Sequence, residues 1–223
     1  MQITSNEIYD PQTGQFTMTG SMHYPRSEAF ATLLDDGSVL ISAGHEAGGA
    51  YVNSAEKFDP STGAFADAGE MFWGYRSANC GTATRLRNGS VLYAGCFSGT
   101  AEIYDPLLGT FTATGNMQEP VGNYSASLLP DGSVLIAGGV VWDSDANAFV
   151  GRNTSEVFDP STGQFTLSGP MMTVRYRHAA ASLGGGRILV AGGTKGETYP
   201  DDFLDSAEIY TSDAIFMDGF DGR

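Results

Sequence analysis

The chain has few basic residues, few cysteines and no long apolar run. Its 223 residues contain 11 Lys and Arg against 26 Asp and Glu, a formal net charge of −15. Nucleic-acid binding needs a basic surface, so this charge excludes it. No apolar stretch reaches membrane-spanning length, and residues 1–10 do not read as a signal peptide. We therefore expect a soluble protein that neither binds nucleic acid nor inserts into a membrane.

Residues that bind metals or carry out catalysis are also scarce. The three histidines, His23, His45 and His178, lie far apart without ligand spacing. Asp143–Asn147 begins like a calcium-binding loop but lacks the Gly and Glu that such a loop needs further on. No serine-hydrolase, zinc-protease, phosphate-loop or dinucleotide motif appears. The sequence predicts no catalytic residue, no metal site and no cofactor.

The chain is instead rich in glycine and in a repeat of about 50 residues. One repeated segment alternates apolar and polar residues into Asp-Pro, then turns at Gly before Phe. Its copies are Glu7–Phe16, Glu56–Phe65, Glu102–Phe111 and Glu156–Phe165, with a degraded copy starting at Glu208. Alternation indicates a half-buried strand, and Pro followed by Gly indicates a tight turn. This segment therefore predicts a β-hairpin.

A second repeated segment alternates with the first. It places Asp-Gly, Asn-Gly or Gly-Gly before an apolar run that ends in small residues. Its copies are Asp35–His45, Arg87–Cys96, Pro130–Gly139 and Gly185–Gly193. Asp-Gly or Asn-Gly between apolar runs is a strong hairpin signal. Each repeat therefore predicts two hairpins, which together make four short strands.

Four-stranded units repeated along a chain favour radial packing of twisted sheets. We therefore expect an all-β fold, a β-propeller of four-stranded antiparallel blades within one domain at residues 1–210. The predicted parts are a half blade at 1–20, blades at 26–70, 76–116, 121–170 and 175–210, and a C-terminal tail at 211–223. This gives four blades, or four and a half.

How the ring ends is left open by the sequence. Residues 5–19 would close a small ring by completing the unit begun at 177–193, which leaves a surplus strand near Tyr210. The alternatives are an open arc that self-associates through its free edge, and a piece of a larger propeller.

The combined pattern, AEIYDPxTGxF followed by LxDGxVLxAGG, resembles the Kelch repeat of bacterial proteins and galactose-oxidase-like propellers. The resemblance covers nearly all of residues 5–210. It implies a fold and leaves the function open, because such propellers carry unrelated activities. A galactose-oxidase-like copper site would need Tyr and His ligands and a Tyr–Cys cross-link. Tyr75 and Tyr93 lie near the cysteines in sequence, but no His pair accompanies them.

Cys80 and Cys96 flank the turn predicted at Asn88-Gly89. A three-residue turn there would make the two cysteines cross-strand neighbours, close enough for a disulfide. A disulfide would suit an extracellular or periplasmic location. The alternative is two small buried thiols.

Arg26, Arg76 and Arg175 recur near the start of successive units, where Val121 takes the place of arginine in one unit. These arginines would bind a carboxylate ligand, or would pair with the repeated Glu of the first segment and serve the structure.

The loops that vary between repeats gather aromatic and acidic residues on one predicted face. The predicted ligand-binding residues are Tyr24, Arg26, Tyr51, Trp73, Tyr75, Arg76, Trp142, Arg175, Tyr176 and His178. The predicted function is a non-catalytic module, not an enzyme, that recognises a protein or carbohydrate through this face. The alternative is a galactose-oxidase-like or glycan-active enzyme, or a fragment of one, using the same face.

Overall fold

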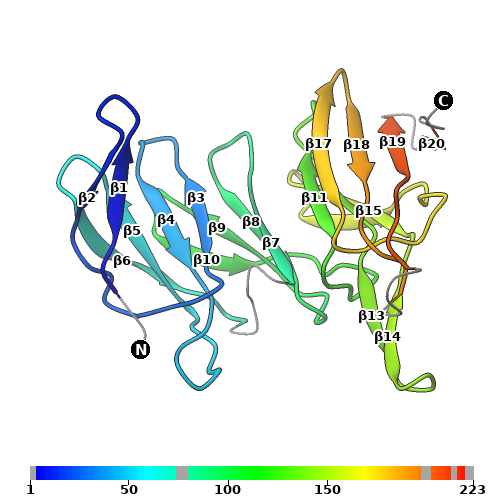
Figure 1. The fold of residues 1–223 in the computed structure, drawn as a ribbon, viewed down its shortest axis with the longest axis horizontal. Helices are drawn as coiled ribbons and strands as arrows, with labels where there is room; N and C mark the ends of the chain where they lie inside the picture. Colours follow the sequence, from blue (N-terminus) through cyan, green and yellow to red (C-terminus); the bar gives the residue numbers. More distant parts are fainter. Residues whose placement is uncertain (1–3, 74–79, 197–201, 212–214, 219–223) are drawn as a thin grey trace.

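The fold is all-β, as the turn residues predict. The computed structural model describes residues 4–73, 80–196, 202–211 and 215–218, and every regular element within them is a β-strand (Figure 1). The strands form six small antiparallel sheets. Among the described residues, no helix is present that would be long and apolar enough to cross a membrane.

Four of the sheets have four strands, and each is built from one repeat. The first sheet contains β3 (Phe30–Leu33), β4 (Val39–Ser42), β5 (Ser54–Asp59) and β6 (Ala64–Glu70). The second contains β7 (Gly81–Arg85), β8 (Val91–Gly95), β9 (Ala101–Asp105) and β10 (Thr110–Ala113). The third contains β11 (Ser125–Leu128), β12 (Val134–Ala137), β15 (Ser155–Asp159) and β16 (Gln164–Leu167). The fourth contains β17 (Ala179–Gly184), β18 (Arg187–Ala191), β19 (Ala207–Thr211) and β20 (Ile215–Asp218).

Two further sheets are isolated hairpins. One is β1 (Glu7–Asp10) with β2 (Gln15–Met18), and the other is β13 (Val140–Asp143) with β14 (Ala148–Gly151). The second hairpin is inserted between β12 and β15 of the third sheet. Its turn is held by the Asp143 carboxylate, which accepts the backbone N–H groups of Asp145 and Ala146, each at 2.9 Å. The stretch that begins like a calcium loop is therefore a hairpin turn.

The Asp-Pro turns show why the repeat folds into hairpins. At the turn between β5 and β6, the Asp59 carboxylate accepts the backbone N–H of Ser61 at 2.8 Å and its hydroxyl at 2.7 Å. The N–H of Gly63 then donates to the Asp59 carbonyl at 2.8 Å. Gly63 has a φ of 69°, a left-handed conformation that glycine adopts without strain.

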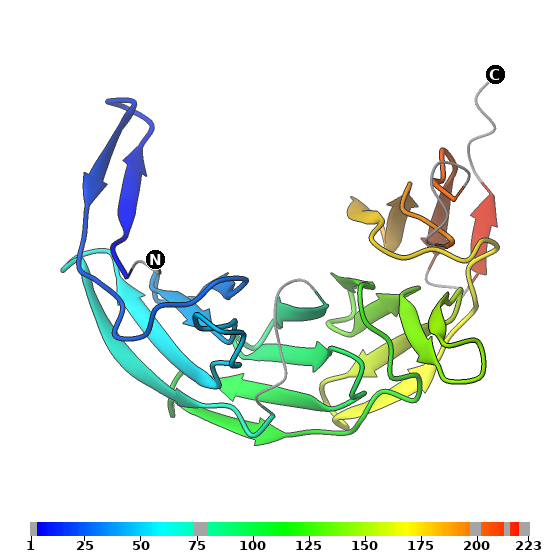
Figure 2. The same cartoon turned by 60° about the horizontal axis from the view of Figure 1, so that its bottom comes forward.

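The core lies between neighbouring sheets, not within one of them. Leu40 and Tyr93 pack in the cluster between the first and second sheets. Leu92 and Phe158 belong to the cluster between the second and third, and Ile188 to that between the third and fourth. The sheets follow one another around an open arc, with β1–β2 projecting at one end (Figure 2). Each sheet is thus stabilised mainly by burial against its neighbours.

The predicted β-propeller is wrong for this structure, because no ring forms. Closure required residues 5–19 to join the hairpin at 177–193. Instead, β18 pairs with β19, in the register Ile188↔Tyr210 to Ala191↔Ala207. The surplus strand near Tyr210 therefore occupies the edge that the N-terminal hairpin would have needed. The described residues form six small sheets, none of them closed.

Candidate functional site

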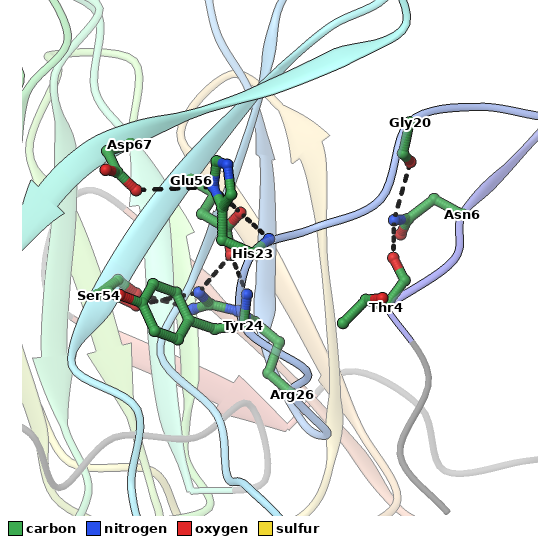
Figure 3. Close-up of polar contacts among 9 residues, drawn as sticks. All are labelled: Thr4, Asn6, Gly20, His23, Tyr24, Arg26, Ser54, Glu56 and Asp67. Carbon is green, nitrogen blue, oxygen red and sulfur yellow. Dashed lines mark hydrogen bonds and ion pairs between the residues drawn. The ribbon is translucent and has the colours of Figure 1, made fainter.

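A buried glutamate recurs in every four-stranded sheet. In the first sheet, the Glu56 carboxylate accepts the backbone N–H groups of His23 at 2.7 Å and Tyr24 at 3.2 Å (Figure 3). Arg26 forms an ion pair with the same carboxylate at 2.9 Å, and both side chains have 0% exposure. The guanidinium also donates to the carbonyls of Ala43 and Ser54, at 3.1 and 2.8 Å. This contact therefore fixes the loop before β3 to β4 and β5.

In the other three sheets the glutamate again accepts two backbone N–H groups. Arg175 pairs with Glu208 at 2.8 Å in the fourth sheet. Glu102 of the second sheet accepts the N–H groups of Phe72 and Trp73. In the third sheet Glu156 accepts those of Gln118 at 2.9 Å and Glu119 at 2.7 Å, while Val121 stands at the arginine position. Arg26 and Arg175, which the sequence singles out, thus hold buried carboxylates in place.

The variable connections lie opposite the tight turns. In Figure 1 the turns between β3 and β4 and between β17 and β18 lie at the top, whereas the β13–β14 hairpin projects at the bottom. The connection from β4 to β5 projects on that same side, and isolated bridges His45↔Tyr51 and Ser27↔His45 shape it. We call this side the loop face.

Three aromatic rings form an exposed cluster on the loop face. Trp142 and Phe149 are directly paired across the β13–β14 hairpin, and their ring centroids lie 5.1 Å apart in an edge-on contact. Phe97 from the second sheet approaches Phe149, with centroids 5.4 Å apart. Exposure is 54% for Trp142, 37% for Phe149 and 36% for Phe97. We call Trp142, Phe149 and Phe97 the aromatic cluster.

Phe97 owes its position to the disulfide beside it. Cys80 and Cys96 are joined, with their Cα atoms 4.8 Å apart. Cys96 and Phe97 both have positive φ values, 73° and 64°. The Phe97 ring lies against Gly122, where an added Cβ would come within 2.5 Å of it. The disulfide and this glycine together direct the ring toward the inserted hairpin.

The remaining predicted aromatic residues fall into two groups. Tyr24, Tyr51 and Trp73 are exposed by 46%, 43% and 43%, and the Tyr51 ring contacts His45 with centroids 4.5 Å apart. Tyr176 is buried, and its hydroxyl donates to the Gly196 carbonyl at 2.9 Å. The structure therefore leaves the first three accessible to a ligand and places Tyr176 beneath the surface.

His178 lies between the third and fourth sheets. Its Nε2 atom is 2.8 Å from the Ser125 hydroxyl, and its Nδ1 atom is buried without a hydrogen bond to any described residue. Burial, with a smaller contribution from nearby Arg175, lowers the pKa of His178 to about 4. A neutral imidazole is therefore part of the packing between two sheets. The predicted residues Tyr75 and Arg76 lie outside the described residues.

A comparison with solved structures found an oxidase with a similar fold. No family model matches the chain, and no curated protein matches it in sequence. A solved structure of a fungal alcohol oxidase of the AA5 family, in complex with copper, is similar with a TM-score of 0.79 and 17% identity. The match covers 98% of this chain and 49% of the oxidase chain, so the chain spans about half the length of that structure.

These findings correct two predictions. Membership of the Kelch-repeat family is not supported, because no family model matches and the sheets do not close into a propeller. The prediction of a non-enzyme is also contradicted, since the similar structure is an alcohol oxidase. The disulfide, together with this neighbour, fits a secreted protein.

The described residues do not fit a copper site. They contain no group of three His, Cys, Asp or Glu side chains arranged to hold a metal ion. His23 contacts Glu56, His45 contacts Glu28, and His178 contacts Ser125, so the three imidazoles lie in separate places. Both cysteines are in the disulfide, which leaves no thiol for a cross-link to tyrosine. No step of a copper reaction is therefore assigned to these residues.

Proposed function

We propose that this chain forms the substrate-binding face of a galactose-oxidase-like or glycan-active enzyme, and that it binds a neutral saccharide or alcohol. The aromatic cluster carries this proposal. Sugar rings present apolar C–H faces that pack on aromatic rings, while their hydroxyls remain free for hydrogen bonds. Trp142 offers the largest of the three exposed ring surfaces at 54% exposure. Its hairpin is anchored to the scaffold through the bridge Gly122↔Val140.

The charge around the cluster favours a neutral substrate. Asp143 and Asp145 lie in the turn of the same hairpin as Trp142 and Phe149. Carboxylates accept hydrogen bonds from hydroxyl groups, whereas the net charge of −15 repels anionic sugars. We therefore expect neutral hexose-containing saccharides to bind better than uronic acids. An extracellular or periplasmic location, where such glycans occur, agrees with the disulfide.

The proposal assigns binding, and not oxidation, to the described residues. Support for an enzymatic context comes from the fold likeness to an alcohol oxidase, of which the chain spans about half. The scattered histidines give no support to a copper centre within the described part of the chain. What these residues do is orient a substrate on rigid aromatic surfaces held by the sheets.

Calorimetric titration with neutral galactose-containing oligosaccharides tests the proposal. We expect saturable binding, and a loss of affinity of about tenfold or more in Trp142→Ala, because a ring–sugar stack contributes roughly 1–2 kcal/mol. Phe16→Ala is the control, because Phe16 is also an exposed aromatic residue, at 66%, but lies on the β1–β2 hairpin. The proposal fails if the unaltered protein binds no saccharide, or if Trp142→Ala binds as tightly as the control.

A further inference from the structure

The β1–β2 hairpin is a copy of the outer hairpins of the first three four-stranded sheets. Its register, from Glu7↔Met18 to Asp10↔Gln15, matches that of β15 and β16, from Glu156↔Leu167 to Asp159↔Gln164. The Tyr9 and Phe16 rings lie 5.0 Å apart at 48°, and the equivalent Phe158 and Phe165 rings lie 4.8 Å apart at 48°. The hairpin therefore already has the geometry of a sheet component.

Its surroundings differ from those of all four equivalents. The residues equivalent to Tyr9 are at most 8% exposed, and they are Phe58, Tyr104, Phe158 and Tyr210. Tyr9 itself is 51% exposed, and Phe16 is 66% exposed. Glu7 is exposed as well, whereas its equivalents Glu56, Glu102, Glu156 and Glu208 are buried. The hairpin thus exposes apolar rings and a carboxylate whose equivalents in the four-stranded sheets are mostly buried.

In the second to fourth sheets the preceding sheet covers the aromatic face, and in all four sheets an inner strand covers the second edge of the outer hairpin. Strands β5, β9, β15 and β19 each pair on their second edge with β4, β8, β12 and β18, respectively. Among the described residues, β1 pairs only with β2, and no described strand lies along its second edge. An open edge presents unpaired N–H and C=O groups to any strand of suitable sequence. Figure 2 shows the hairpin projecting from one end of the arc.

The four covering strands define the sequence that such an edge accepts. From its N-terminal end, each strand has a β-branched residue, a leucine, a further apolar residue and then a small residue. These are Val39-Leu40-Ile41-Ser42, Val91-Leu92-Tyr93-Ala94, Val134-Leu135-Ile136-Ala137 and Ile188-Leu189-Val190-Ala191. The β-branched residue faces the aromatic equivalent of Tyr9 in every case. In all four sheets, two backbone N–H groups from the loop before the inner hairpin also bind the glutamate equivalent to Glu7.

We propose that the open edge of β1 is a docking site for a β-hairpin of a partner polypeptide. The docking strand has the sequence pattern of the four inner strands, and the loop before it donates N–H groups, with or without an arginine, to Glu7. Strand addition of this kind gives affinity through the main chain and specificity through alternate side chains. It would place a β-branched residue opposite Tyr9, as in the four complete sheets.

A second copy of this chain is a poorer occupant. The inner hairpins β3–β4, β7–β8, β11–β12 and β17–β18 are each paired already with an outer strand of their own sheet. A second copy would therefore have to break one of its sheets in order to supply such a hairpin. Pairing β1 with β1 of another copy would supply no loop N–H donors to Glu7.

A synthetic peptide of residues 22–45 is the probe, because it carries β3, β4 and the loop with Arg26. We expect the full chain to bind it in a 1:1 ratio in calorimetry, with slowed amide hydrogen exchange at residues 7–10. Tyr9→Ser in the full chain should weaken binding by about tenfold or more, because a buried aromatic contact is lost. A peptide with Leu40→Pro should not bind, because proline removes a ladder hydrogen bond.

Control variants distinguish specific binding at the edge of β1 from nonspecific hydrophobic association. Leu107→Ser removes a 94% exposed leucine at the β9–β10 turn and should leave peptide affinity unchanged. Circular dichroism and melting temperature should be unaltered in Tyr9→Ser, since that side chain is half exposed. The proposal is overturned if the peptide does not bind, or if the Leu40→Pro peptide binds equally. It is also overturned if light scattering shows a dimer that Tyr9→Ser dissociates, because the occupant is then a second copy.

Discussion

The first and fourth sheets hold their buried glutamates with an arginine, whereas the third sheet does not. Arg26 and Arg175 lie 2.9 and 2.8 Å from the Glu56 and Glu208 carboxylates. Glu156 is 2% exposed, and no cation among the described residues lies opposite it. Backbone N–H groups alone therefore suffice to place the carboxylate, and the arginine adds a link between neighbouring strands through its bonds to carbonyl oxygens.

The pKa of Glu156 reflects this difference. Burial raises the pKa of its carboxyl above the ordinary 4.5, although the N–H groups of Gln118 and Glu119 lower it in part. A buried charge without a counter-ion is costly, and protonation relieves that cost. The comparison teaches that the repeated Arg and Glu are architectural, and that their roles can be separated by substitution.

Removing the arginine should have the largest effect. Arg175→Ala leaves the buried Glu208 charge without its partner, and we expect a loss of about 3–5 kcal/mol in unfolding free energy. Urea denaturation at neutral pH measures it. Arg187→Ala is the control, because Arg187 is exposed and should change stability by less than about 0.5 kcal/mol. Equal effects of the two substitutions would mean that the buried ion pair contributes nothing.

The second sheet differs from the others at its disulfide. Cys96 has a φ of 73° at the position where Gly44, Gly139 and Gly193 stand in the other sheets. Replacing both cysteines by alanine should cost about 3 kcal/mol, because a loop of this length is no longer cross-linked. Cys80→Ala with Cys96→Gly should recover about 1 kcal/mol of that loss, since glycine tolerates positive φ. Thermal unfolding of the two double variants measures this difference. Equal melting temperatures would contradict the idea that the positive φ at position 96 is strained for alanine.

Acid should weaken the contact between the third and fourth sheets through His178. Its pKa is about 4 in the fold and 6.5 as the ordinary value, so the unfolded chain binds the proton more readily. The stabilising effect of the neutral ring is complete above pH 6.5 and is lost as the pH falls toward 4, by up to about 3 kcal/mol. His178→Gln should remove this part of the pH dependence in urea denaturation between pH 7 and 4.5. If unfolding free energy depends on pH in the same way in His178→Gln as in the unaltered protein, the neutral, buried imidazole is contradicted.

The smallest effect is expected at the unpaired glutamate. Glu156→Gln removes a buried charge that has no counter-ion, so unfolding free energy at pH 7 should change by less than about 1 kcal/mol. Glu208→Gln should cost about 3 kcal/mol, because it leaves Arg175 unpaired. Lowering the pH from 7 toward 4.5 should favour the unaltered protein relative to Glu156→Gln, since its native state takes up the proton first. Equal losses of unfolding free energy in Glu156→Gln and Glu208→Gln at pH 7 would contradict the different roles of the two glutamates.

The strands and turns were predictable from the sequence, because they depend on local chemistry. Asp-Pro followed by Gly, and Asp-Gly before an apolar run, define hairpins at the scale of a few residues. The closure of the ring was not predictable in this way. Glu7–Asp10 and Ala207–Thr211 have nearly the same sequence, so both suit the edge of β18. The nearer segment pairs with it, because a short connection loses less chain entropy than a long one.

Part of the candidate site was also beyond sequence reasoning. Trp142 was predicted as a ligand-binding residue in a long loop, but residues 140–151 form a hairpin that pairs it with Phe149. The short apolar runs on either side of the polar turn after Asp143 were the available signal. Phe97 was not predicted, because its position depends on the disulfide and on Gly122 from a different repeat. Contacts between side chains of different repeats cannot be predicted from the residue pattern within one repeat.

The central claim is that the repeated residues build the scaffold and the aromatic cluster binds the substrate. A crystal structure of the chain grown with a neutral galactose-containing oligosaccharide tests it most directly. We expect a sugar ring packed on Trp142 and Phe149, with its hydroxyls directed to the acidic turn of the same hairpin. A sugar bound instead among the tight turns on the opposite side, or no bound sugar at saturating concentration, would contradict it.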